Sequence, residues 1–133
     1  RRRSNTPLQA LNLLNDPVFF EAAQGFARRM ARQRLEAESW KSEQTKVDPV
    51  AVALDWAFKT ATSRPASADE LETMLELFRS QRQAFSENGV PKSLLEEPIG
   101  PLPEDLQQLP AEELAAWTIV ANVLLNLDEV LTR

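Results

Sequence analysis

The sequence predicts an all-α domain: a helical bundle of four main helices with up-and-down connections, preceded by one short N-terminal helix. Apolar residues recur at steps of three and four along five stretches of the 133-residue chain, which is the spacing of one helix face. Four of these stretches open with a capping side chain followed by proline or by a Ser/Thr-x-x-Glu/Gln box. A chain of this length buries roughly two thirds of its unfolded surface, so a single domain spanning residues 1–133 is expected.

The short first helix is expected between Thr6 and Asn15. Pro7 lacks an N–H and already has a helical φ, so it suits the first helical position. The Thr6 hydroxyl can cap the helix, and Gln9 completes the capping box three residues later. Asn15 tolerates positive φ and can end the helix. Because leucines surround most of this helix, we expect it to lie inside the fold.

A second helix is expected from Pro17 to about Trp40. Asp16 precedes the proline as a capping residue, and the positive end of the helix dipole favours its carboxylate. Beyond Trp40 the sequence is polar and aperiodic, which predicts a loop. One face of this helix carries apolar residues at helical spacing: Phe19, Ala23, Phe26 and Met30.

The third helix is expected to begin at Asp48-Pro49, with the same cap and first-turn proline as the second. It should end before Arg64-Pro65, because a residue that precedes proline is steered away from α geometry. Its apolar face is broad and nearly continuous and includes Trp56.

The fourth helix is expected to open at a capping box formed by Ser67 and Glu70, and to stop at Asn88-Gly89. Residues 88–109 are a Pro-rich connection within the domain. Five prolines in residues 91–110 argue against regular structure there, while several leucines argue against disorder. We therefore expect an irregular strap that lies over the bundle.

The last helix is expected from about Pro110 to Leu131. Leucine, valine and Trp117 recur along it at three- and four-residue steps, and its opposite side is apolar as well. A helix that is apolar all round belongs in the middle of a fold.

The residue types that are missing exclude several kinds of chemistry. The chain has no cysteine, histidine or tyrosine. It therefore has no disulfide, no Ser-His-Asp or Cys-His catalytic set, and no histidine-ligated zinc or haem, so no cofactor is expected. No apolar run is long enough to cross a bilayer, and no signal segment opens the chain. The start at three consecutive arginines suggests a fragment of a longer protein.

The charge of the chain is unevenly distributed. Residues 1–34 hold seven arginines against Asp16 and Glu21, a balance of +5, and residues 35–133 have a balance of −10. The plainer interpretation is that the basic part packs against the rest of the chain or against missing sequence. The sharper one is an arginine face that binds an anionic polymer such as a sulfated glycan. An overall pI near 4.8 argues against nucleic acid.

Several motifs together resemble the planctomycete surface-protein family, and specifically the C-terminal part of its large domain of unknown function. They include residues 5–17, Arg64-Pro65 with Ser67 and Glu70, residues 113–117 and residues 124–133. At Thr62-Ser63 the sequence departs from the Leu-Gly that we would expect before the arginine. The motif positions that carry the resemblance, or that we assign to helix ends, are Thr6, Pro7, Gln9, Asn15, Asp16, Pro17, Arg64, Trp117, Asn126 and Asp128.

The resemblance implies a setting for the chain. Members of that family are exported multi-domain proteins, often with an N-terminal cytochrome-c-like module, which places this domain in the periplasm or at the cell surface. The partners it implies are the upstream domains of the same polypeptide. The haem attachment motif Cys-x-x-Cys-His is absent from these residues, so a redox role of the parent cannot be carried here.

Few residues qualify as a functional site. Trp56 and Trp117 lie on apolar helix stripes, so core packing is favoured over sugar stacking, whereas Trp40 stays open because it lies at a helix end. The candidate interaction surface is therefore Arg28, Arg29, Arg32 and Trp40.

The carboxylate pairs of the last helix are weak candidates for catalysis. Neighbouring residues on a helix, such as Glu112 and Glu113, point about 100° apart and do not readily converge on one proton or metal. Arg64 and Asp128 belong to different motifs and are interpreted as a buried structural pair.

These observations favour a non-catalytic C-terminal domain with a structural or protein-interaction role. The alternative is an accessory part of a polysaccharide-acting or redox enzyme whose chemistry lies upstream. Binding of glycan or polyanion through the arginine face is a further alternative.

Overall fold

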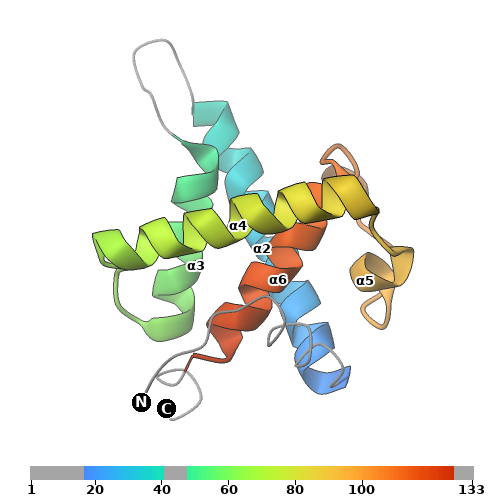
Figure 1. Ribbon diagram of the computed structural model, residues 1–133, viewed down its shortest axis with the longest axis horizontal. Coiled ribbons are helices and arrows are strands. Elements are labelled where there is room, and N and C mark those ends of the chain that lie inside the picture. Colours follow the sequence, from blue (N-terminus) through green and yellow to red (C-terminus); the bar gives the residue numbers. More distant parts are fainter. Residues whose placement is uncertain (1–16, 41–47, 128–133) are drawn as a thin grey trace.

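The computed structural model describes residues 17–40 and 48–127, and every regular element within them is helical (Figure 1). This confirms the predicted all-α bundle. The expected helix between Thr6 and Asn15 lies outside the described residues. In chain order the elements are α2 (Pro17–Trp40), α3 (Pro49–Thr62), α4 (Ala68–Asn88), α5 (Lys92–Glu96), the 3-10 turn η1 (Glu104–Leu106) and α6 (Ala111–Leu125).

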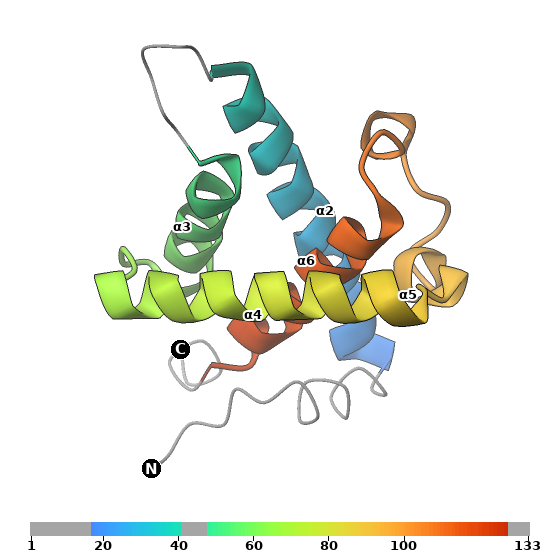
Figure 2. The same cartoon turned by 45° about the horizontal axis from the view of Figure 1, so that its top comes forward.

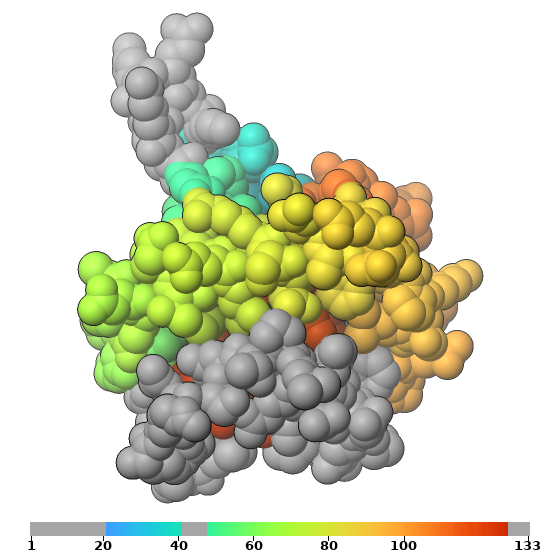
Figure 3. Space-filling model, in the orientation of Figure 1, coloured from blue at the N-terminus to red at the C-terminus, as the bar shows by residue number. Residues whose placement is uncertain are grey.

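The central element is α6. Every residue from Glu113 to Leu124 is buried, as expected for a helix that is apolar on both sides. Helices α2 and α4 make the main contacts with it, and α3 packs chiefly on α2. On the face shown in Figure 3, α4 runs across the middle of the molecule, and small areas of α6 are visible below it.

The helices cross one another instead of running up and down side by side. In Figures 1 and 2, α4 lies across α6 and α2, and α2 and α6 cross behind it. The physical reason lies in α6: a helix that is apolar all round accepts partners from any direction, so its neighbours need not be parallel to it.

The predicted helix starts are confirmed at α3 and α4. The Asp48 side chain accepts a hydrogen bond from the Val50 N–H, with Pro49 in the first turn. At the start of α4, Ser67 and Glu70 form the complete reciprocal capping box. Helix α4 ends at Asn88, where Gly89 follows with a φ of 87°.

Helix α3 ends where predicted, one residue before Arg64. The residue that follows the helix and caps it is Ser63, which has a φ of 67° and donates its backbone N–H to the Lys59 carbonyl. This is the left-handed conformation that glycine adopts most easily, at the position where the family resemblance leads us to expect glycine.

Helix α6 is shorter than predicted. It ends at Leu125, not near Leu131, and Asn126 has the non-helical angles φ −108° and ψ 13°. The Asn126 side chain donates to the Asn122 carbonyl at 2.8 Å, so a side chain satisfies one carbonyl of the last turn. Apolar spacing continued past this point, and spacing alone does not reveal such an ending.

The Pro-rich strap is more regular than predicted. It contains α5 and η1, although five prolines lie in or beside it. It does lie over the bundle: α5 contacts α6, and η1 contacts α2. Leu94 and Leu106 are buried, so apolar burial stabilises a helical segment that is too short to persist alone.

Candidate functional site

Gln24 holds the strap to α2. Its side chain is buried, and its Nε2 donates to the carbonyls of Leu94 at 2.6 Å and Glu97 at 2.8 Å, at the C-terminal end of α5. These end carbonyls lack intrahelical partners. One amide thus supplies the missing donors and joins two segments that are distant in sequence.

Arg28 lies one turn further along the same face of α2. Its Nη2 donates to the Leu95 carbonyl at 3.1 Å and to the Gly100 carbonyl at 2.6 Å. Burial lowers the pKa of Arg28, and the positive charge of Arg32 adds to this, while Glu96 acts in the opposite direction.

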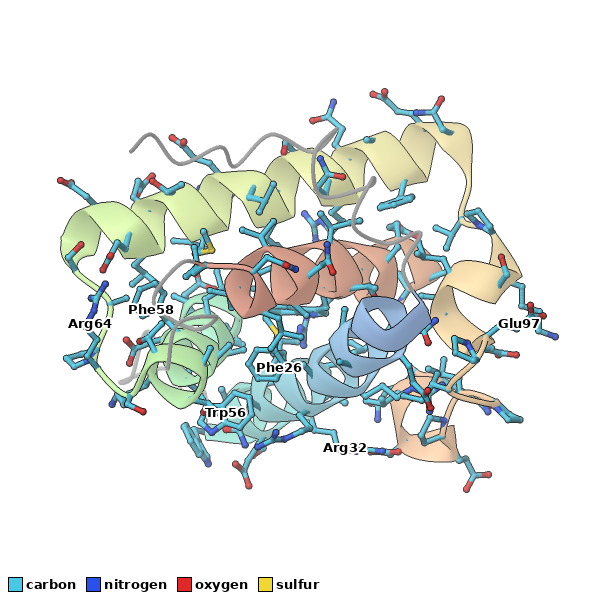
Figure 4. All side chains as sticks on the ribbon, turned by 90° about the horizontal axis from the view of Figure 1, so that it is seen from below. Phe26, Arg32, Trp56, Phe58, Arg64 and Glu97 are labelled. Atoms are coloured by element: carbon cyan, nitrogen blue, oxygen red, sulfur yellow. The ribbon has the colours of Figure 1, made fainter. Side chains whose placement is uncertain are left out.

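Arg32 continues the same row and reaches η1. Its Nε donates to Asp105 at 2.9 Å, and this hydrogen bond lowers the pKa of the Asp105 carboxyl. Both side chains are about half exposed (Figure 4 labels Arg32). Two of the three arginines of the candidate interaction surface, Arg28 and Arg32, therefore bind the chain's own strap.

Arg29 and Trp40 lie elsewhere on α2. The Arg29 guanidinium lies 5.2 Å from the centroid of Trp56 and 5.9 Å from that of Phe26, as a cation over two aromatic rings. Figure 4 shows Phe26 and Trp56 next to each other, with ring centroids 6.0 Å apart. Trp40 is 54% exposed.

An open hollow of about 430 Å³ lies between α2 and α3 beside these rings. It takes residues from one stripe of each helix. Its lining consists of Gln33, Trp40, Val52, Asp55, Trp56, Lys59 and Thr60.

A second hollow, of about 470 Å³, lies between α4 and the start of α6. Its lining includes Arg79 and Arg82 on α4 and Glu112 on α6. The arginine and glutamate charges partly cancel. Among the described residues, no aromatic side chain lines this hollow, in contrast to the first.

Sequence reasoning missed a buried ion pair between α2 and α6. Arg34 Nε lies 2.7 Å from Glu113 Oε2, and the Glu113 side chain is 3% exposed. The N–H does not point at the oxygen, so the contact is an ion pair rather than an aligned hydrogen bond. The Trp117 indole N–H donates to the same oxygen at 3.3 Å. The available signal was a glutamate one helical turn before tryptophan in an apolar helix.

Arg64 binds Glu70 through both guanidinium nitrogens, at 2.8 and 3.0 Å, and lies over the Phe58 ring at 4.9 Å (Figure 4). This contact lowers the pKa of Glu70 to about 2. The Arg64 side chain is 43% exposed, so the predicted burial of this residue is wrong. Its predicted partner Asp128 lies outside the described residues.

The remaining predicted positions fall into two groups. Trp117 is fully buried against Phe78, with ring centroids 4.3 Å apart, Pro17 begins α2, and Asn126 follows α6. Trp56 is only partly buried, so it packs on the core and lines the first hollow as well. The positions that lie outside the described residues are Thr6, Pro7, Gln9, Asn15 and Asp16.

Residues 17–40 and 48–127 contain no group of three or more acidic, histidine or cysteine side chains that could hold a metal. No helix in the same ranges combines the length and hydropathy that crossing a bilayer requires.

Comparison with known proteins yields one match. Residues 1–78 match the model of PSD1, a family described as a protein of unknown function (DUF1553). No curated protein and no solved structure matches the chain. The motifs around Trp117 and Asn126 lie beyond the matched residues. Because the match covers more than half of the 133 residues, the chain belongs to the PSD1 family of unknown function.

Proposed function

We propose that this chain is a non-catalytic C-terminal domain of an exported multi-domain protein, with a structural or protein-interaction role. The observation that supports the proposal is that two buried polar side chains, Gln24 and Glu113, bind other parts of the same fold. Gln24 binds the strap, and Glu113 binds Arg34 and Trp117. These buried polar side chains thus serve contacts within the fold.

The hollows support the same proposal. A hydrolytic site needs a nucleophile or a pair of acid and base groups within reach of one substrate atom. Among the described residues, the first hollow offers one carboxylate, Asp55, and the second offers one, Glu112. In that part of the chain, neither lining presents two carboxylates that face one substrate.

The test is turnover by the purified chain. We expect no hydrolysis of chromogenic glycoside, ester, phosphate or sulfate substrates. We also expect the separately produced upstream part of the parent protein to bind the chain in a titration. Turnover that disappears with Asp55→Asn or Glu112→Gln would overturn the non-catalytic role, and absence of binding would overturn the proposed partner.

The proposed setting is the periplasm or the cell surface. Fractionation of cells that express the full-length gene product tests it: we expect the protein in the periplasmic or surface fraction. Retention in the cytoplasm would contradict this.

A second candidate is an accessory role for an upstream polysaccharide-acting or redox enzyme. The exposed Trp40 and the partly buried Trp56, which share one hollow, favour this candidate. The arginine face receives less support, because Arg28 and Arg32 bind the strap.

A further inference from the structure

We propose that the hollow between α2 and α3 binds a neutral carbohydrate chain. This goes beyond the proposed structural role, because it assigns a ligand class to a specific surface. The residues used below are Gln33, Trp40, Asp55, Trp56, Lys59 and Thr60, here called the tryptophan hollow.

The helix geometry brings these side chains together. Gln33 and Trp40 are seven residues apart on α2, so they lie two turns apart on one face. On α3, Lys59 lies one helical turn after Asp55, and Thr60 lies one turn after Trp56. The two stripes thus border an open hollow of about 430 Å³.

The aromatic content points to stacking. Trp40 is the large hydrophobic residue that is exposed among the described parts, so much of its indole is open to a ligand. Trp56 is held in place by contacts with Phe26 and Arg29. An indole face is electron-rich, and the C–H groups on one face of a sugar ring carry partial positive charge, so the two stack favourably.

The polar content suits hydroxyl groups. Asp55 accepts hydrogen bonds, Lys59 donates them, and Gln33 and Thr60 can do both. Each sugar hydroxyl can both donate and accept a hydrogen bond, so it can pair with any of these side chains. The apolar surface of the described lining comes from Val52 and the two tryptophans, so it is mostly aromatic.

The charge of the lining favours a neutral ligand. Asp55 and Lys59 lie 4.0 Å apart as a weak ion pair, with 45% and 59% of their side chains exposed, and they cancel each other. Among the described residues, no other ionised side chain lines the tryptophan hollow. An anionic glycan or a nucleic acid would find no excess positive charge among these lining residues.

The experiment is a binding titration of the 133-residue chain with cellohexaose, xylohexaose and mannohexaose, followed by tryptophan fluorescence and calorimetry. A heparin hexasaccharide is the charged probe. We expect at least one neutral oligosaccharide to bind, with a dissociation constant that changes less than about twofold between about 50 and 500 mM NaCl.

Variants then locate the site. Trp40→Ala should weaken binding about tenfold or more without changing the unfolding temperature, because Trp40 is exposed. Asp55→Asn should weaken binding as well. Arg82→Ala, in the hollow between α4 and α6, is the matched control and should leave binding within about twofold.

Three results would overturn the assignment: no binding of any neutral probe, equal binding by Trp40→Ala, or binding of heparin alone with loss at high salt. Analysis of the oligosaccharides for cleavage products after the titration tests the proposed non-catalytic role separately from sugar binding. Cleavage of a bound oligosaccharide would refute the non-catalytic role while leaving the binding site intact.

Discussion

Arg34 and Glu113 form an ion pair at 2.7 Å between the C-terminal half of α2 and the first turn of α6. Glu113 is almost fully buried, whereas Arg34 is 22% exposed and also contacts Glu38 at 3.3 Å. Removing one partner of a buried pair leaves the other charge uncompensated, which costs more than the pair itself contributes.

Glu113→Gln should therefore lower the free energy of unfolding by about 2–3 kcal/mol, toward the lower end for buried pairs because Arg34 keeps Glu38 and some solvent. Urea denaturation measures this. The neighbouring Glu112→Gln is the control and should cost less than about 1 kcal/mol. The double variant Arg34→Met with Glu113→Gln removes both charges and keeps an acceptor for the Trp117 indole N–H, so it should recover most of the loss. A failure to recover would contradict the ion-pair interpretation.

Gln24→Ala should release the strap from α2. The carbonyls of Leu94 and Glu97 lose their donor, so we expect a loss of about 2 kcal/mol in unfolding free energy. Hydrogen exchange should accelerate at the Glu97 and Gly100 amides, which bond to carbonyls of α5.

The matched control for this variant is Gln83→Ala. Its amide donates only to Glu87 on the exposed face of α4, so the change should stay within about 0.5 kcal/mol. Unchanged exchange at the strap in Gln24→Ala would show that Gln24 does not fasten it.

Ser63→Gly should stabilise the protein. A non-glycine residue in the left-handed conformation is strained, and relief of that strain exceeds the entropy that glycine adds to the unfolded chain, for a net gain of about 0.5–1 kcal/mol. Gly89→Ala, at a φ of 87°, should be destabilising by about 1 kcal/mol or more. Thermal unfolding of both variants tests the pair, and a lower unfolding temperature for Ser63→Gly would refute the strain argument.

Acid should weaken the connection between α3 and α4 through Glu70. Hydrogen bonding by Arg64 lowers the pKa of Glu70 from 4.5 to about 2 in the folded protein. A carboxyl with a lower pKa in the folded state contributes stability above the unfolded pKa, and that contribution is lost as the pH falls from about 4.5 to about 2.

The Glu70 side chain is 36% exposed, so solvent screening limits the contribution to under about 1 kcal/mol. Carboxyl NMR titration should place the Glu70 pKa well below its ordinary value, and Arg64→Ala should raise it. An unchanged Glu70 titration in Arg64→Ala would contradict the assigned cause.

The local features of the fold could be predicted because they depend on neighbours in sequence. Asp48 and Ser67 cap helices through N–H groups two or three residues away, and Gly89 ends α4 by its own backbone freedom. Burial of α6 could be predicted too, since a helix apolar on both sides is stable only when it is covered.

The long-range polar contacts could not be predicted in the same way. The helical spacing predicts that Arg28 lies beside the apolar stripe of α2 and is exposed. In the structure its side chain donates hydrogen bonds to carbonyls 67 and 72 residues away. The sequence places Glu113 in a carboxylate pair with Glu112, but in the structure Glu113 forms an ion pair with Arg34. Which charged side chain meets which carbonyl depends on how α2, the strap and α6 are placed in space.

The residue order alone thus accounts for the helix starts and stops from Asp48 to Gly89, the central position of α6 and membership of an all-α class. These follow from backbone donors, capping side chains and apolar periodicity, which act within a few residues. The crossing of α4 over α6, the helical turns in the strap and the placement of Trp40 and Trp56 at one hollow follow from packing in three dimensions. Contacts between segments dozens of residues apart depend on the whole folded chain, because no local pattern encodes their geometry.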